Sequence, residues 1–136
     1  MPFVLDASVV GCWALEDEGH PAADVAFMRI ETDEAVVTSL WWFEVRNILV
    51  VNERRGRITE PETANFLRDL ARLRIRIDRL PEETEILRLT RAHRLSVYDA
   101  SYLEVAQREH IPLATLDAKL SVAARAERVT LIGQSI

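Results

Sequence analysis

Four acidic residues share one kind of position: each follows a predicted strand or lies in the first turn or so of a predicted helix. They are Asp6, Glu44, Asp99 and Asp117. In a parallel sheet covered by helices, the C-terminal ends of the strands and the N-terminal ends of the following helices meet at one edge. The sequence therefore predicts that these carboxylates converge at that edge.

Four carboxylates held close together repel one another, so at least one should take up a proton unless a cation lies between them. A hard divalent cation resolves this conflict, because Mg²⁺ or Mn²⁺ prefers oxygen ligands and is held by one or two carboxylates together with water and phosphate. Such an ion lowers the pKa of a bound water and stabilises charge on a phosphodiester. The pattern indicates metal-dependent phosphodiester hydrolysis.

Each acid also has a purely structural interpretation. Asp99 follows Ser96 by three residues, which is the spacing of a capping box, and Asp117 precedes a predicted helix as an N-cap would. Glu44 could be an exposed helix acid, although its neighbours are aromatic and apolar. Asp6 is the hardest to explain in this way, since a charge at the mouth of a buried strand costs several kcal/mol unless it is paired or metal-bound.

Three polar residues accompany the acids. Ser8 follows Asp6 by two residues, Thr115 precedes Asp117 by two, and Asn47 lies one helical turn after Glu44. Each could orient a carboxylate or a metal-bound water. Ser8 and Thr115 could equally be turn or cap residues. The three histidines show no ligand-like spacing and are expected at the surface or at helix ends; they are His20, His93 and His110.

Composition sets limits on the class of protein. The chain has 136 residues, 49% of them hydrophobic, which fits one domain (1–136) with a real core. The net charge of −5 argues against a basic protein that coats a duplex, but a bound metal would supply local positive charge for a nucleic-acid substrate. The single cysteine, Cys12, excludes an internal disulfide and fits a reducing cytoplasm. The N-terminus lacks the basic region of a signal peptide, and no apolar stretch approaches the ~20 residues of a membrane span.

Strands and helices alternate along the predicted chain. Strands are expected at 3–6, 35–39, 75–78, 112–115 and 129–132. Helices are expected at 7–18 (interrupted at Gly11), 20–30, 40–56, 59–73, 81–95, 96–110 and 117–127. This alternation predicts an α/β fold with a central parallel sheet of about four or five short, buried strands and helices on both faces.

Several blocks of the sequence resemble the PIN-domain ribonucleases, and more narrowly the VapC-type toxins of toxin–antitoxin pairs. The blocks run nearly end to end in the order of that family: "LDAS" (5–8), "TSLWWFEVRNIL" (38–49), "ERRGRIT" (53–59), "LSVYDASYLEVA" (95–106) and "LATLDAKL" (113–120). The acidic positions of the family fall on the four acids above, its hydroxyl positions on Ser8 and Thr115, and its helix asparagine on Asn47. Thr38 stands where many members have proline, which alters a turn but leaves the acids intact.

The resemblance implies a PIN-like fold and a Mg²⁺- or Mn²⁺-dependent endoribonuclease that cuts structured RNA, such as tRNA or rRNA. We expect Asp6 and Asp99 to be the metal ligands. The resemblance also implies a cytoplasmic homodimer, away from membranes, inhibited by a small VapB-type antitoxin. The aromatic cluster Trp41–Phe43 could belong to the antitoxin groove, to the dimer interface or to the core.

Two other hypotheses remain open. One is a phosphoacceptor aspartate, as in phosphatases of the haloacid dehalogenase type or in receiver domains. The former needs a second aspartate where Ser8 stands; the latter would use Asp78, but the acidic pair expected after the first strand is missing. The other is a catalytically silent PIN domain that serves as a binding module, although no acid is missing from this chain.

Overall fold

A four-stranded parallel sheet forms the centre of the protein in the computed structural model, which describes residues 1–15 and 19–133. Its strands are β1 (Phe3–Leu5), β2 (Ala35–Val37), β3 (Ile75–Ile77) and β4 (Leu113–Ala114). The order across the sheet is β3-β2-β1-β4, with Phe3 beside Ala35 and Val4 beside Leu113. Because β1 lies between β2 and β4, the residue that follows it, Asp6, lies in the middle of the row of strand C-terminal ends.

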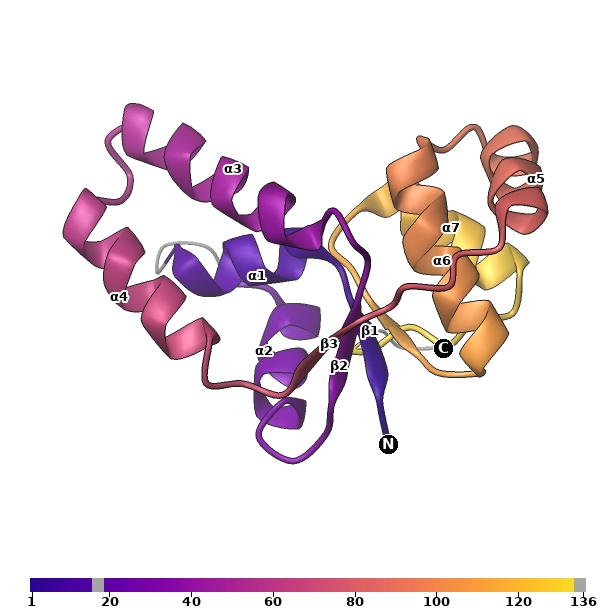
Figure 1. Ribbon diagram of the computed structural model, residues 1–136, viewed down its shortest axis with the longest axis horizontal. Coiled ribbons are helices and arrows are strands. Elements are labelled where there is room, and N and C mark those ends of the chain that lie inside the picture. Colours follow the sequence, from indigo (N-terminus) through magenta and orange to yellow (C-terminus); the bar gives the residue numbers. More distant parts are fainter. Residues whose placement is uncertain (16–18, 134–136) are drawn as a thin grey trace.

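Helices cover both faces of the sheet, as the alternating pattern predicted. One face carries α1 (Ala7–Ala14), α2 (Pro21–Arg29), α3 (Trp41–Arg54) and α4 (Glu60–Leu70) (Figure 1). The other carries α5 (Glu83–His93), α6 (Val97–Glu109) and α7 (Ala118–Ala126) (Figure 1). The predicted fold class is therefore confirmed, and both halves of the chain meet at the central strand.

Side-chain caps begin several of these helices. Thr59 and Glu62 form the predicted capping box of α4, with Thr59 Oγ1 accepting from the Glu62 amide and Glu62 Oε1 accepting from the Thr59 amide. Nδ1 of His20 accepts from the Ala22 amide at the start of α2. His93 and His110 lie at the ends of α5 and α6. The histidines thus have the helix-end positions expected for them.

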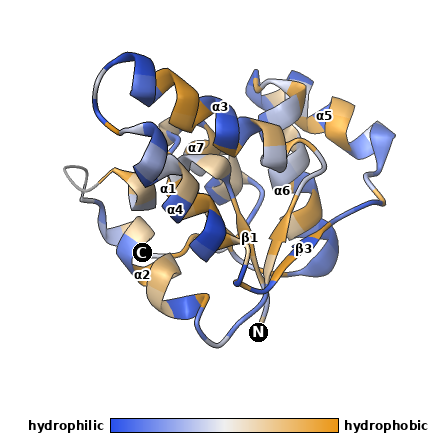
Figure 2. Ribbon diagram, turned by 60° about the vertical axis from the view of Figure 1, so that its left-hand side comes forward, coloured by the Kyte–Doolittle hydropathy of each residue, from blue (hydrophilic) through white to orange (hydrophobic). Residues whose placement is uncertain are grey.

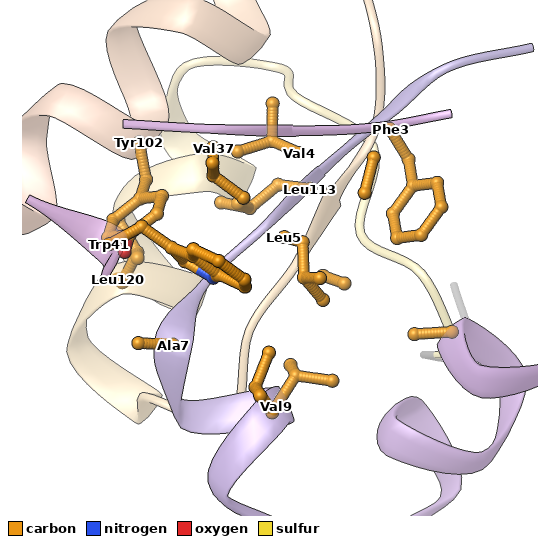
Figure 3. Packing of buried hydrophobic residues seen from close by; sticks show 14 of the residues in the cluster. Phe3, Val4, Leu5, Ala7, Val9, Val37, Trp41, Tyr102, Leu113 and Leu120 are labelled. Carbon is orange, nitrogen blue, oxygen red and sulfur yellow. The ribbon is translucent and has the colours of Figure 1, made fainter. Parts of the chain in front are cut away.

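The core lies on both sides of β1 and β2, whose residues are completely buried. Their side chains contact apolar residues of the flanking helices, including Val9, Trp41 and Leu120 (Figure 3). Figure 2 shows the hydrophobic β1 in the interior, while hydrophilic residues lie mainly on the helices and connections. Burial of this apolar surface is the main source of stability and fixes the edge from which Asp6 projects.

Two predictions about these elements are wrong, and a third falls partly outside the described residues. Segment 129–132 forms no strand: it makes a single bridge, Leu113 to Leu131, because β4 has only two residues to pair with. Gly11 does not interrupt α1; it faces α3, where an added Cβ would lie 3.0 Å from Ile48 Cγ2. The end of the predicted helix 7–18, residues 16–18, lies outside the described residues.

Strand β3 is not buried on both faces as predicted. It is one of the two edge strands of the sheet, and all three of its residues are partly or fully exposed. Its central residue, Arg76, binds Glu34 and Glu109, both 2.9 Å away. A charged edge discourages pairing with a foreign strand. Within the described residues, none of the helices has the length and apolarity needed to cross a membrane.

Candidate active site

Asp6 lies directly after β1, and its carboxylate is fixed by two hydroxyl groups. Its side chain is only 4% exposed. Oδ2 accepts hydrogen bonds from Thr115 Oγ1 at 2.6 Å and from Ser8 Oγ at 2.9 Å. Asp6 occupies the N-cap position of α1, but its side chain makes no cap hydrogen bond there. N-capping of the helix therefore does not explain why an aspartate occupies this position.

Burial raises the pKa of Asp6 above its usual value, with a further upward contribution from the charge of Glu44, while the hydroxyls of Thr115 and Ser8 lower it. The donors are neutral, so the carboxylate is oriented but its charge is not cancelled. A carboxylate in such a setting either takes up a proton or binds a cation.

The strand end of β4 supplies Thr115 and Asp117. Thr115 is 1% exposed, and its hydroxyl also accepts from the Asp117 amide at 3.1 Å. Ser8 Oγ accepts from the Leu116 amide at 3.0 Å, which ties the start of α1 to the same segment. Asp117 Oδ1 caps α7 by accepting from the Leu120 amide at 2.8 Å. Asp117 is thus an N-cap, as its structural interpretation predicted. Its charge also acts on Asp99 and raises the pKa of that residue.

Asp99 approaches the site from α6. It is half-buried in the first turn, where its amide donates to Ser96 Oγ at 3.0 Å. Its pKa is raised by burial and then by the charges of Asp6 and Asp117, with an opposing effect from Ser96 and Lys119. These charge interactions place Asp99 near both Asp6, which follows β1, and Asp117, which follows β4.

Glu44 is held by a residue that the sequence did not single out. It lies in the first turn of α3, and its Oε1 accepts from the phenol of Tyr102 at 2.7 Å. Tyr102 is completely buried and lies one turn after Asp99 on α6, so the two residues share a helix face. That i, i+3 spacing is the only sequence signal that pointed to it.

The remaining predicted residue, Asn47, is exposed on α3 one turn after Glu44. The site contacts described above involve the other six predicted residues, and none of them involves Asn47. Its place on the helix agrees with the prediction, while its function stays a prediction.

The donor set fits a hard cation held partly through water. The described residues contain no group of three or more His, Cys, Asp or Glu side chains arranged to enclose a metal on their own. They do provide a buried carboxylate with neutral donors, Asp6, and a second carboxylate, Asp99, whose pKa is raised by burial and by the charges of other acids. Mg²⁺ typically binds through one or two carboxylates and keeps several waters, which matches this arrangement.

The raised pKa of Asp6 predicts a pH-dependent stability in metal-free protein. The folded state binds the Asp6 proton more tightly than the unfolded state, whose value is near 3.8. Asp6 therefore lowers stability at neutral pH, and this penalty disappears as the pH falls through the folded pKa towards 3.8. Urea unfolding of the wild type and Asp6→Asn, in chelator from pH 7 to pH 4, should show the wild type gaining stability relative to the variant. A constant difference would contradict the prediction.

Comparison with known proteins places this geometry in a family. The family model described as PIN domain matches residues 3–126. The chain belongs to the PIN-domain family. The match includes all four strands and all four acids. The chain is also 30% identical over 125 residues to Ribonuclease VapC3 of Pyrobaculum aerophilum, covering 89% of this chain and 93% of that one. The resemblance to VapC-type PIN domains is thereby confirmed.

Solved structures share the PIN fold. PAE2754 from Pyrobaculum aerophilum superposes with a TM-score of 0.69 at 24% identity, covering 90% of this chain and 84% of that one. VapC20 of Mycobacterium tuberculosis, a sarcin–ricin loop cleaving toxin, gives 0.59 at 16% identity, covering 89% and 94%. FitAcB from Neisseria gonorrhoeae gives 0.54 at 17% identity, covering 96% of each chain. At these identities the structures establish the fold of this PIN domain.

Proposed function

We propose that this PIN domain is a divalent-metal-dependent endoribonuclease and the toxin of a type II toxin–antitoxin pair. The observation that carries the proposal is the buried Asp6 carboxylate, held by neutral hydroxyls and charge-coupled to Glu44 and Asp99. The similarity to Ribonuclease VapC3 supports RNA as the substrate. The structural neighbour VapC20, a sarcin–ricin loop cleaving toxin, supports a structured target, and we propose rRNA or tRNA.

In the proposed mechanism Asp6 and Asp99 hold Mg²⁺ or Mn²⁺. When bound, the metal supplies a water of lowered pKa and a positive charge beside the scissile phosphate. Thr115 and Ser8 keep Asp6 Oδ2 pointed to the site, and Tyr102 does the same for Glu44. Glu44 and Asp117 complete the acidic group, and Asn47 orients water or phosphate on the exposed side. We expect the protein to act in the cytoplasm.

The aromatic segment of α3 supports a protein partner. Trp41 is buried in the core, whereas Trp42 and Phe43 are 48% and 62% exposed. The guanidinium of Arg46 lies 3.8 Å from the centroid of the Trp42 ring. We propose that this surface contacts either the VapB-type antitoxin or the second subunit of a homodimer, because large exposed aromatic side chains are typical of interfaces.

The direct test is cleavage of total RNA by the purified protein. We expect cleavage with Mg²⁺ or Mn²⁺, none with EDTA, and recovery when metal is added back in excess. Cleavage that persists in EDTA would disprove the metal-dependent mechanism. A protein that binds Mn²⁺ weakly or not at all and cleaves no RNA would instead be the silent binding module. The phosphoacceptor hypothesis gains no support, since Asp78 is paired with Arg108.

Metal binding should also stabilise the protein. A ligand present at 100 times its dissociation constant raises the free energy of unfolding by about 2.7 kcal/mol. We therefore expect Mn²⁺ to raise the melting temperature of the wild type at pH 7.5 and to leave that of Asp6→Asn almost unchanged. Thermal unfolding followed by tryptophan fluorescence would measure this, with NaCl of matched ionic strength as control. Equal stabilisation of both proteins would show that the ion binds elsewhere.

A further inference from the structure

The phenol of Tyr102 joins α6 to the first turn of α3. Its hydroxyl donates to Glu44 Oε1 at 2.7 Å, and the side chain of Thr38 lies near the phenol and opposes the rise of its pKa. Thr38 directly follows β2, and its carbonyl accepts from the Trp41 amide at 3.1 Å, where α3 begins. Both neighbours of the phenol therefore belong to the segment that places Glu44.

The phenol is a fixed donor to the carboxylate. Burial, followed by the charges of Asp6 and Glu44, raises the pKa of Tyr102 far above its usual value, so the hydroxyl stays protonated. A carboxylate oxygen can only accept, so the phenol proton is the one that lies between Tyr102 and Glu44 Oε1. The bond uses Oε1 and leaves Oε2 of Glu44 able to face the site.

The type of donor matters as much as its position. A lysine or arginine would hold Glu44 more strongly but would also neutralise charge near Asp6. Tyr102 orients Glu44 without adding charge, as Thr115 and Ser8 do for Asp6. A buried phenol usually has a hydrogen-bond partner. The partner of Tyr102 is a half-buried carboxylate whose charge also acts on Asp6, so the bond reaches the site.

We propose that Tyr102 is a positioning residue: its hydroxyl fixes the Glu44 carboxylate at the sheet edge beside Asp6. The proposal rests on the function proposed above, in which Glu44 belongs to the active site. Tyr102 touches neither the metal nor the RNA in this scheme and acts only through Glu44.

The test uses Tyr102→Phe, which removes the hydroxyl and keeps the ring. Single-turnover RNA cleavage should slow by about tenfold to hundredfold, the usual effect of losing an outer partner of a metal or catalytic group, with RNA affinity unchanged. Tyr98→Phe is the matched control, because this phenol is exposed on the same helix, and it should cleave at the wild-type rate.

Coupling to Glu44 separates positioning from a general structural effect. In a Glu44→Ala background, Tyr102→Phe should produce no further loss, since the partner through which it acts is gone. An equal loss in both backgrounds would overturn the proposal. Crystal structures of the wild type and Tyr102→Phe give a readout that does not depend on activity: the Glu44 carboxylate should leave its place beside α6 in the variant. The two proposals can fail separately. If the wild type cleaves no RNA and binds no Mn²⁺, the proposed function is wrong. If the Glu44 carboxylate keeps its place in the Tyr102→Phe crystal structure, the positioning role is wrong.

Discussion

Replacing Asp6 with asparagine should abolish RNA cleavage while leaving the protein folded and as stable as the wild type or more so. Asparagine keeps the size of the side chain and an oxygen for Thr115 and Ser8, but it removes the negative charge that would hold the metal. Losing about 4 kcal/mol of charge stabilisation lowers the rate roughly a thousandfold, at 1.36 kcal/mol for each factor of ten. Stability should not fall, because burial raises the pKa of Asp6 and makes its charged form unfavourable.

The measurement pairs single-turnover RNA cleavage with thermal unfolding of the same preparations. Asp69→Asn is a matched control, since Asp69 is an exposed acid on α4, a helix that contributes none of the four acids. It should cleave RNA at the wild-type rate. Activity within tenfold of the wild type in Asp6→Asn would remove Asp6 from the mechanism. A lower melting temperature would instead show that its charge is paired in a way the contacts do not reveal.

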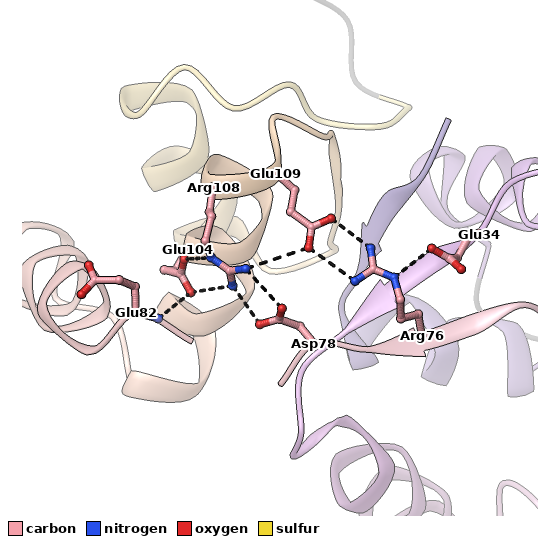
Figure 4. Close-up of polar contacts among 7 residues, drawn as sticks. All are labelled: Glu34, Arg76, Asp78, Glu82, Glu104, Arg108 and Glu109. Atoms are coloured by element: carbon pink, nitrogen blue, oxygen red, sulfur yellow. Dashed lines mark hydrogen bonds and ion pairs between the residues drawn. The ribbon is translucent and has the colours of Figure 1, made fainter. Parts of the chain in front are cut away.

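Replacing Arg108 with methionine should destabilise the protein by about 3 kcal/mol or more, because it leaves two largely buried carboxylates without a cation. Arg108 Nε lies 2.7 Å from Glu104 Oε2, and Nη2 lies 2.8 Å from Asp78 Oδ2 (Figure 4). The side chains of Glu104 and Asp78 are only 2% and 9% exposed. Glu104 Oε1 also accepts from the Glu82 amide at 3.2 Å, so the cluster joins α6 to the connection between β3 and α5.

Arg76 provides the comparison within the same cluster. It also bridges two carboxylates, Glu34 and Glu109 (Figure 4). These carboxylates are 42% and 26% exposed, far more than those that Arg108 binds. Arg76→Met should therefore cost only about 0–1 kcal/mol. Urea unfolding of both variants would measure the difference. Adding Glu104→Gln to Arg108→Met should recover part of the loss, since one uncompensated charge is removed. Equal losses for the two arginine variants would contradict the role of burial.

The sequence predicted side-chain positions correctly where an acidic or hydroxyl residue directly follows a strand. Asp6 and Thr115 end buried parallel strands, and the topology alone brings such ends together. Asp99 and Asp117 lie at helix starts that follow from capping signals, so their positions were also predictable. These positions depend on local rules that each segment carries in its own residues.

Contacts between distant segments were not predictable in this way. Tyr102 and Glu104 lie among the apolar residues of α6, and nothing local distinguishes a phenol that binds Glu44 from one that only fills space. The partner of Glu104 within its helix, Arg108, has the ordinary i, i+4 spacing, but its bond to Asp78 depends on tertiary packing. Gly11 was misjudged for the same reason, since its role is the approach of α1 to Ile48 rather than a break in its own helix.

The central place of β1 has a consequence for synthesis of the chain. β1 pairs on one side with β2 and on the other with β4, which leads into Thr115 and Asp117. Asp6 is therefore made 109 residues before Thr115, one of the two hydroxyl groups that orient its carboxylate. If the protein destroys RNA that translation needs, this order of synthesis delays assembly of the full site until β4 has left the ribosome.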